Sequence, residues 1–106
     1  MSTENKKKSL ALKLLESVSG GPVTLGRLIE AIRLGEELSQ PDFSKRLGIS
    51  KSHLNDIEKE RKTVSPERAA RFACALGYSE KRFVQLSLQS QLDQSGLKFR
   101  VDLDAA

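Results

Sequence analysis

The 106-residue sequence has little of what metal sites, disulfide scaffolds and membrane spans require. It contains one cysteine, Cys74, one histidine, His53, and no tryptophan. One thiol cannot form an internal disulfide, and one thiol with one imidazole cannot supply the three or four ligands of a zinc site. Apolar runs extend over only a few residues, and the polar start, residues 1–8, has no hydrophobic region after it. We therefore expect no metal, no cofactor, no membrane and no secretion signal, which favours a cytoplasmic location.

Aromatic residues are also scarce, at 5% of the chain, while hydrophobic residues make up 38%. This composition predicts one small domain with an aliphatic core. Lysine and arginine number 18 against 14 acidic residues, which gives a formal net charge of +4. The excess favours an anionic partner, although an excess of this size fits many proteins.

Start and stop signals divide the chain into short helices. Residues 1–8 are expected to form a flexible basic arm, and residues 9–20 an accessory helix. The next helix is expected to carry an inward stripe from Leu25 to Leu38. Four more helices are expected over about 40–47, 51–59, 66–76 and 80–95. The expected N-caps are Thr24, Ser39, Ser50, Ser65 and Ser79, and Gly48, Gly77 and Gly96 are expected to end helices.

The last segment changes its period. Leu97, Phe99, Val101 and Leu103 alternate strictly with charged residues, which predicts a β-strand with one apolar face. The chain has no obvious second strand, and unpaired backbone groups are costly. A second copy of the protein is therefore expected to supply the partner strand, in a pairing centred on Arg100. The alternatives are that the segment folds back or stays loose until another partner binds.

Two short helices joined at Leu47-Gly48-Ile49-Ser50 describe a helix-turn-helix unit, whose second helix enters the DNA major groove. The run from Ser39 to Glu58, together with Ser65-Pro66 and the stretch 75–79, resembles the Cro and phage-repressor (XRE) helix-turn-helix family. The resemblance covers about residues 25–79. It implies an all-α, lambda-repressor-like bundle that binds double-stranded DNA, and it contains no metal or catalytic residue.

The family resemblance assigns roles to particular side chains. It implies a structural ion pair between Arg33 and Glu58; the alternative is two unrelated surface charges. It places the base-reading positions of the recognition helix at Lys51, Ser52, Asn55 and Asp56. Lysine can donate to guanine, asparagine can form paired bonds to adenine, and serine can serve either base. Asp56 can accept from a cytosine amine but repels phosphate, so we expect it to enforce selectivity.

Phosphate contacts are expected at Gln40, at the positive end of its helix, and at Lys59, Arg61 and Lys62. Residues 45–71 hold eight basic and four acidic residues, so this stretch alone accounts for the net charge of +4. A solvated charged surface is the plain alternative. His53 lies at the flank of the recognition helix, where a half-buried packing role is at least as reasonable as DNA contact.

One departure from the family pattern affects this loop. Relatives usually carry a glycine soon after the final glutamate of the recognition helix, whereas this chain reads Lys59-Glu60-Arg61-Lys62. Either the helix continues for another turn, or Glu60 takes an unusual turn conformation.

These expectations combine into one organisation. Residues 24–79 form the DNA-binding domain, and residues 80–106 form a helix and strand for dimerisation through Leu97, Phe99, Val101 and Leu103. Cys74 is expected to be buried in an alanine-rich helix, and because no nucleophile and base can be assigned, we expect no enzyme. The leading function is a repressor that binds a palindromic operator as a homodimer. The alternative is an autoregulating antitoxin, of the HigA or HipB kind, that also binds a toxin protein.

Overall fold

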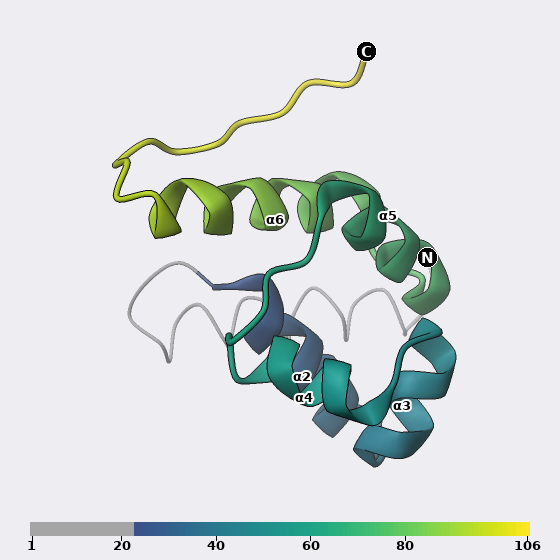
Figure 1. The fold of residues 1–106 in the computed structure, drawn as a ribbon. Coiled ribbons are helices and arrows are strands. Elements are labelled where there is room, and N and C mark those ends of the chain that lie inside the picture. Colours follow the sequence, from purple (N-terminus) through teal and green to yellow (C-terminus); the bar gives the residue numbers. More distant parts are fainter. Residues whose placement is uncertain (1–22) are drawn as a thin grey trace.

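The computed structural model describes residues 23–106, and these residues form a bundle of α-helices (Figure 1). The helices are α2 (Leu25–Gly35), α3 (Gln40–Leu47), α4 (Lys51–Glu58), α5 (Pro66–Leu76) and α6 (Glu80–Gln94). The all-helical fold expected for residues 24–79 is confirmed. The arm expected at residues 1–8 and the accessory helix expected at 9–20 lie outside the described residues.

The five helix starts are the expected ones. The side-chain oxygens of Thr24, Ser39, Ser50, Ser65 and Ser79 each accept a hydrogen bond from the backbone N–H three residues later. A short polar side chain in extended backbone satisfies an N–H that has no partner inside the helix. This local bond explains why the starts can be predicted from sequence.

The five described helices end in the same backbone conformation. A residue with positive φ follows each helix, and the N–H of the next residue bonds to a carbonyl five residues back, as in a Schellman motif. The residues with positive φ are Glu37, Gly48, Glu60, Gly77 and Gly96. Glycine adopts this conformation without strain, whereas glutamate does not.

The end of α2 differs from the expectation. The helix stops at Gly35 instead of continuing to Leu38, because Glu37 takes φ 57° and the Leu38 N–H bonds to the Arg33 carbonyl at 3.1 Å. Leu38 still packs against the core, but from the turn. The apolar spacing predicted its burial correctly and its secondary structure wrongly.

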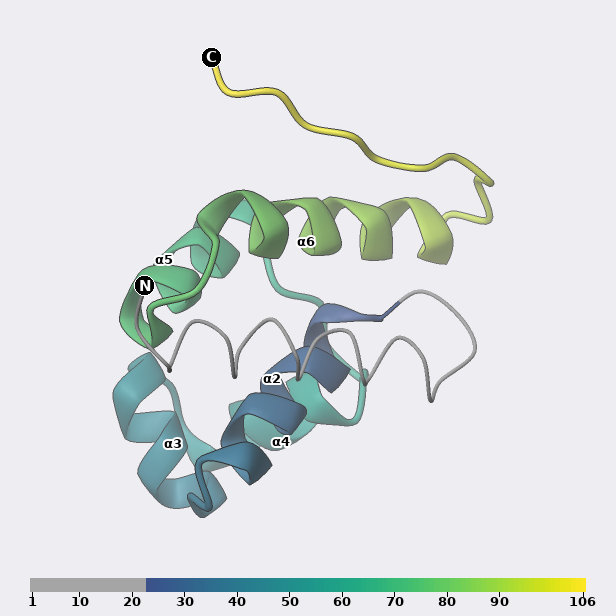
Figure 2. The same cartoon turned by 180° about the vertical axis from the view of Figure 1, so that it is seen from behind.

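One continuous core holds the helices together. Helix α2 contacts α4 and α6, α3 contacts α4 and α5, and α5 packs against α6 (Figures 1 and 2). The core is largely aliphatic, with three fully buried phenylalanines at Phe43, Phe72 and Phe83. Helices α2 and α4 approach so closely that a Cβ on Gly26 would lie 2.2 Å from the Ile57 carbonyl oxygen. This contact positions α4 against the rest of the bundle.

The C-terminal strand expected from the alternation is absent from residues 23–106. The segment after Gly96 instead turns and runs back beside α6 (Figures 1 and 2). The Gln89 side-chain amide donates to the Phe99 carbonyl and accepts from the Val101 N–H, each at 2.8 Å, and the Gln85 amide donates to the Val101 carbonyl at 2.8 Å. Because no second strand is present, side-chain amides satisfy backbone groups that a strand would otherwise satisfy.

The expectation for Cys74 was also wrong, because its side chain is exposed. The thiol lies 3.9 Å from a Glu80 carboxylate oxygen. In α5 the buried face is formed by Ala69, Phe72, Ala73 and Leu76, and Cys74 follows it on the solvent side. Cys74 is therefore next to Ala73 in sequence but does not lie on the buried face of α5.

Candidate nucleic-acid interface

Helices α3 and α4 are joined by a three-residue connection, Gly48 to Ser50. Gly48 has φ 71°, and no atom lies within 4 Å of the Cβ that another residue would place there. Phe43 and Leu47 anchor α3 in the core, and the small Ser44 is buried with its hydroxyl donating to the Pro41 carbonyl at 2.8 Å. The connection therefore fixes the two helices at a sharp angle, as a helix-turn-helix unit requires.

Helix α4 has one buried face and one open face. Leu54 and Ile57 are fully buried, while Lys51 and Ser52 are exposed and Asn55 and Asp56 are half-buried. Ser50 caps the helix by accepting from the His53 N–H at 3.0 Å. The four expected base-reading side chains therefore lie on the accessible side of a helix whose other side is held by the core.

A hydrogen-bonded network links α2, α3 and α4 beneath that open face. Arg33 Nε and Nη2 donate to the two Glu58 carboxylate oxygens at 2.8 and 3.0 Å, and Arg33 Nη1 donates to the Leu38 carbonyl at 3.1 Å. Gln40 Nε2 donates to Glu58 Oε1 at 3.0 Å and to Asn55 Oδ1 at 3.2 Å. The structure thus brings Arg33 and Glu58 together and adds Gln40 as a link to Asn55.

The Arg33–Glu58 pair is buried, since the side chains are 13% and 0% exposed. The hydrogen bond to Glu58 raises the pKa of Arg33 above its ordinary value, against the opposing effect of burial, and the nearby Glu58 and Glu30 charges add to the increase. Removing one partner of such a pair leaves a buried charge without compensation, at a cost of about 3 to 5 kcal/mol. The pair therefore locks α2 to the end of α4.

Gln40 contacts α4 rather than pointing freely outward. Its side-chain amide nitrogen donates to Asn55 and Glu58, so the group left for a phosphate is the Gln40 backbone N–H, because Pro41 has no N–H and the Asp42 N–H bonds to Ser39. The bond from Gln40 orients the Asn55 side chain. The Asn55 amide nitrogen has no hydrogen-bond partner within residues 23–106 and is available to a base edge.

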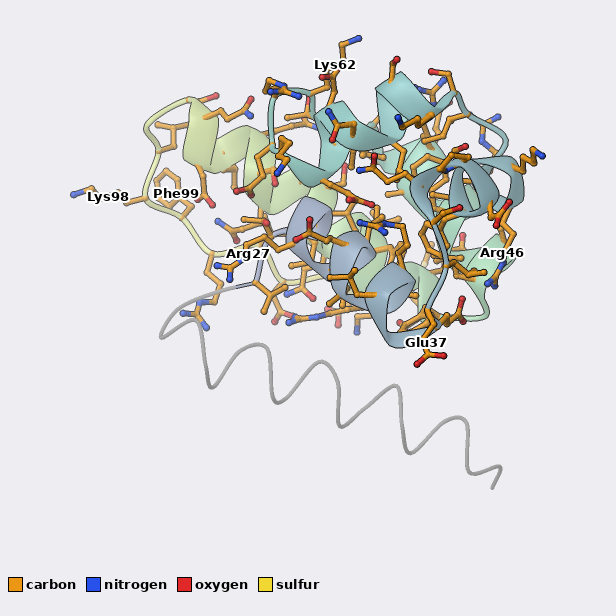
Figure 3. All side chains as sticks on the ribbon, turned by 90° about the horizontal axis from the view of Figure 1, so that it is seen from below. Arg27, Glu37, Arg46, Lys62, Lys98 and Phe99 are labelled. Carbon is orange, nitrogen blue, oxygen red and sulfur yellow. The ribbon has the colours of Figure 1, made fainter. Side chains whose placement is uncertain are left out.

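Asp56 is engaged with two of the expected phosphate-binding residues. Its carboxylate lies 3.1 Å from Arg61 Nε and 3.6 Å from Lys62 Nζ, and its backbone carbonyl accepts from both of their N–H groups at 2.8 and 3.3 Å. Arg61 and Lys62 remain about 60% exposed, and Lys62 projects outward in Figure 3. Asp56 therefore holds these two cations beside the recognition helix and partly neutralises them.

Of the two conformations expected for the loop after α4, a longer helix or an unusual turn at Glu60, the structure has the turn. Helix α4 ends at Glu58, Lys59 is the exposed C-cap residue, and Glu60 adopts φ 59°. Glu60 therefore takes the unusual turn conformation, in the left-handed region that favours glycine.

His53 is half-buried and lies beside Arg68 of α5, whose Nη1 is 3.3 and 3.5 Å from the two imidazole nitrogens. Burial, then the positive charges of Arg68 and Lys62, lower the pKa of His53 below its ordinary value of 6.5, while Asp56 opposes the shift. In the sequence, Arg68 only contributes to the positive charge of residues 45–71. No sequence pattern reveals its contact with His53, because the pairing depends on how α5 packs beside α4.

A scan of protein-family models shows which family this geometry belongs to. The helix-turn-helix family model matches residues 29–83, just over half of the chain. The chain belongs to the helix-turn-helix family of the XRE type, a DNA-binding family rather than a catalytic one. No curated protein and no solved structure gives a significant match.

Residues 23–106 contain neither a membrane-spanning helix nor a cluster of metal-binding side chains. No helix in this range is long and apolar enough to cross a membrane. No group of three or more histidine, cysteine, aspartate or glutamate side chains in the same range is placed to hold a metal ion. The DNA-binding assignment rests on the helix-turn-helix geometry and the family match.

Proposed function

We propose that the protein is a sequence-specific transcriptional regulator, acting as a repressor, that reads DNA with the open face of α4. The observation that carries the proposal is the arrangement of Lys51, Ser52 and Asn55 on that face. The core holds the opposite face, and the Arg33–Glu58–Gln40 network fixes the helix and orients Asn55. A rigid helix with accessible donors suits base reading in the major groove.

Backbone phosphates on either side of the groove fit the cations that flank α4. Lys59, Arg61 and Lys62 are exposed in the loop after the recognition helix, and the first turn of α3 offers the free backbone N–H of Gln40. Asp56 restrains two of these cations, so it favours sites that give α4 additional base contacts. In this assignment phosphate contacts provide affinity, and α4 provides discrimination.

The experiment compares operator and random DNA for two sets of variants. Replacing Lys51 and Asn55 by alanine is expected to reduce discrimination by about 1 to 3 kcal/mol for each good base contact. Replacing Arg61 or Lys62 by alanine is expected to weaken binding to DNA of every sequence and to flatten the salt dependence of that binding. The operator itself comes from selection in a random DNA pool. Equal losses on every sequence for both sets would show that α4 does not read bases.

One recognition helix reads only a few base pairs, so specific binding calls for two copies on a palindromic operator. The exposed side chains of Leu97 and Phe99, 47% and 66% accessible, support the C-terminal segment with Val101 and Leu103 as the dimer surface. A chain cut after Gly96 is expected to sediment as a monomer and to bind the operator weakly. If the shortened chain still forms the same dimer, the dimer surface lies outside the C-terminal segment.

The same exposed apolar residues favour a second candidate, an antitoxin that covers them with a toxin protein and represses its own operon. Co-expression with the product of an adjoining gene distinguishes the two candidates. A stable complex that restores growth to cells expressing that product would support the antitoxin. If that product is not toxic and forms no complex, the antitoxin is excluded and the repressor is the one candidate that remains.

A further inference from the structure

The C-terminal segment presents one edge of its backbone to α6 and the other to solvent. In an extended chain the N–H and C=O groups of alternate residues point to opposite edges. Gln85 and Gln89 bond only to odd-numbered residues, Phe99 and Val101. The backbone groups of Lys98, Arg100 and Asp102 form no hydrogen bond within the described residues 23–106, and Lys98 points away from the body of the molecule (Figure 3).

The bonds to Gln89 satisfy the inner edge of the segment in the way that a neighbouring strand would, although residues 97–106 form no strand themselves. One amide donates to the carbonyl of Phe99 and accepts from the N–H of Val101, which is how a residue of a neighbouring β-strand would bond. The inner edge is thus occupied by side chains, and the outer edge is left with unpaired donors and acceptors. Such an edge is a template for another extended chain.

The side chains of the segment complement a second copy of itself. An antiparallel pair through the even-numbered edge can be centred on Arg100 or on Val101. Centring on Arg100 places two arginines opposite each other. Centring on Val101 places Arg100 opposite Asp102 and Lys98 opposite Asp104, so that every charged pair is of opposite sign.

The apolar residues favour the same alignment. With Val101 at the centre, Val101 faces its own copy and Phe99 faces Leu103, both in non-hydrogen-bonded positions where side chains lie closest. Phe99, the most exposed large hydrophobic residue described, is thereby covered. Docking of the segment on α6 orders it in advance, which reduces the entropy lost on pairing.

We propose that two copies of this chain join through an antiparallel β-ribbon of their C-terminal segments, centred on Val101, with Gln85 and Gln89 holding the inner edge. The proposal rests on the dimer of the proposed function. It replaces the alignment on Arg100 expected from sequence. It specifies which edge pairs, in which register, and which helix residues prepare the segment.

Disulfide trapping in the full chain tests the register. In a Cys74→Ala background, Val101→Cys is expected to form a covalent dimer on mild oxidation, because the two thiols face each other. Arg100→Cys is the matched control and is expected to stay largely monomeric on a non-reducing gel. The opposite pattern would overturn the register. Failure of both variants to crosslink, in a protein that still sediments as a dimer, would overturn the ribbon.

Charge reversal tests the pairing without cysteine. Arg100→Asp and Asp102→Arg each place like charges opposite one another, so each variant alone is expected to dissociate at least tenfold more readily than the unmodified chain. Mixed together, the two variants are expected to recover a heterodimer. Both residues are exposed, so folding should not change. Absence of recovery on mixing would contradict the assigned neighbours.

The role of α6 has its own test. Gln89→Ala removes the two bonds that Gln89 makes to the segment, leaving that of Gln85, and is expected to weaken the dimer several-fold, while Gln91→Ala, at an exposed position of the same helix, is expected to leave it unchanged. Equal effects would overturn the assigned role of Gln89. A monomeric charge variant whose DNA binding still depends on Lys51 and Asn55 would show that α4 works as proposed, whatever happens to the ribbon.

Discussion

Two glutamates end helices in a conformation that glycine usually provides. Glu37 and Glu60 have φ 57° and 59°, and the left-handed conformation costs an L-residue roughly 1 to 2 kcal/mol. Glu60 lies at the end of the recognition helix, where its turn brings Arg61 and Lys62 back toward Asp56. The chain therefore stores strain at the loop that is proposed to contact phosphate.

Glu60→Gly is expected to stabilise the fold by about 1 kcal/mol, because glycine takes the left-handed conformation without strain. For a domain of this size that gain corresponds to a rise in Tm of about 4 to 8 °C. Thermal unfolding followed by circular dichroism measures it. Gly48→Ala, at φ 71° with open space around the new methyl group, is expected to lose a similar amount. A Glu60→Gly variant less stable than the unmodified chain would show that the Glu60 side chain stabilises the turn.

Asp56→Asn should strengthen binding to random DNA, because it releases Arg61 and Lys62 and removes a negative charge near the phosphates. A charge about 4 Å away is worth about 1 kcal/mol in water, so the gain should be up to about fivefold at low salt. Fluorescence anisotropy with random duplexes at several salt concentrations measures it. Glu80→Gln removes the same charge from the start of α6 and is the matched control. An equal gain in both variants would contradict a local role for Asp56.

His53 is expected to make stability depend on pH. Its pKa is lowered in the folded state, so folding favours the neutral imidazole. This stabilisation is complete above the unfolded value of about 6.5 and is lost as the pH falls through 6.5 toward the folded pKa. Urea unfolding at pH 8 and pH 5.5 should show a lower midpoint at pH 5.5, and His53→Gln should reduce the difference. Higher stability at pH 5.5 would contradict the direction of the shift.

At the scale of elements, Gly26 decides how close α2 and α4 lie. A methyl group there would lie 2.2 Å from the Ile57 carbonyl oxygen, which is backbone and cannot rotate away. The position of the recognition helix α4 therefore depends on the absence of a side chain at Gly26 in α2. Because Gly26 sits inside an ordinary amphipathic period, no local pattern in the sequence reveals this contact.

Gly26→Ala is expected to destabilise the fold by about 1 to 3 kcal/mol, because α2 and α4 must separate and the Arg33–Glu58 pair with them. Gly35→Ala is the matched control in the same helix, since nothing lies within 4 Å of its added methyl group and alanine favours helix. Chemical unfolding of both variants measures the contrast. Equal stability of the two variants would mean that the helices can shift without cost.

Helix starts and the placement of α3 and α4 could be predicted because they depend on local chemistry. A serine or threonine at an N-cap bonds within its own turn, and Gly48 marks the sharp connection. The end of α2 and the turn at Glu60 could not be predicted in the same way, because glutamate carries no local signal for a left-handed conformation. The bonds of Gln40 and Arg68 also required the packed bundle, because their partners lie 15 or more residues away in sequence.

At the scale of the whole molecule, the excess positive charge and the unpaired backbone edge lie in different segments of the chain. Residues 45–71, which include α4, account for the net +4, whereas the C-terminal segment carries two basic residues, Lys98 and Arg100, followed by two acidic ones, Asp102 and Asp104. Each segment therefore has chemistry suited to one partner, DNA for the first and a second copy for the second. The proposed antiparallel pairing gives the dimer a two-fold axis, which is the symmetry of a palindromic operator.

This symmetry makes the spacing of operator half-sites a test of the whole assembly. Two α4 helices in a rigid dimer should read successive major grooves on one face of the duplex, about 34 to 36 Å or about 10 base pairs apart. Inserting about five base pairs turns one half-site to the opposite face, so operator affinity is expected to fall to that of a single half-site. Mobility-shift titration of the normal and extended operators measures the loss, with the chain cut after Gly96 as the control that should not respond to spacing. Equal affinity of the full chain for both operators would mean that each copy binds DNA on its own, and that the C-terminal ribbon does not couple the two recognition helices.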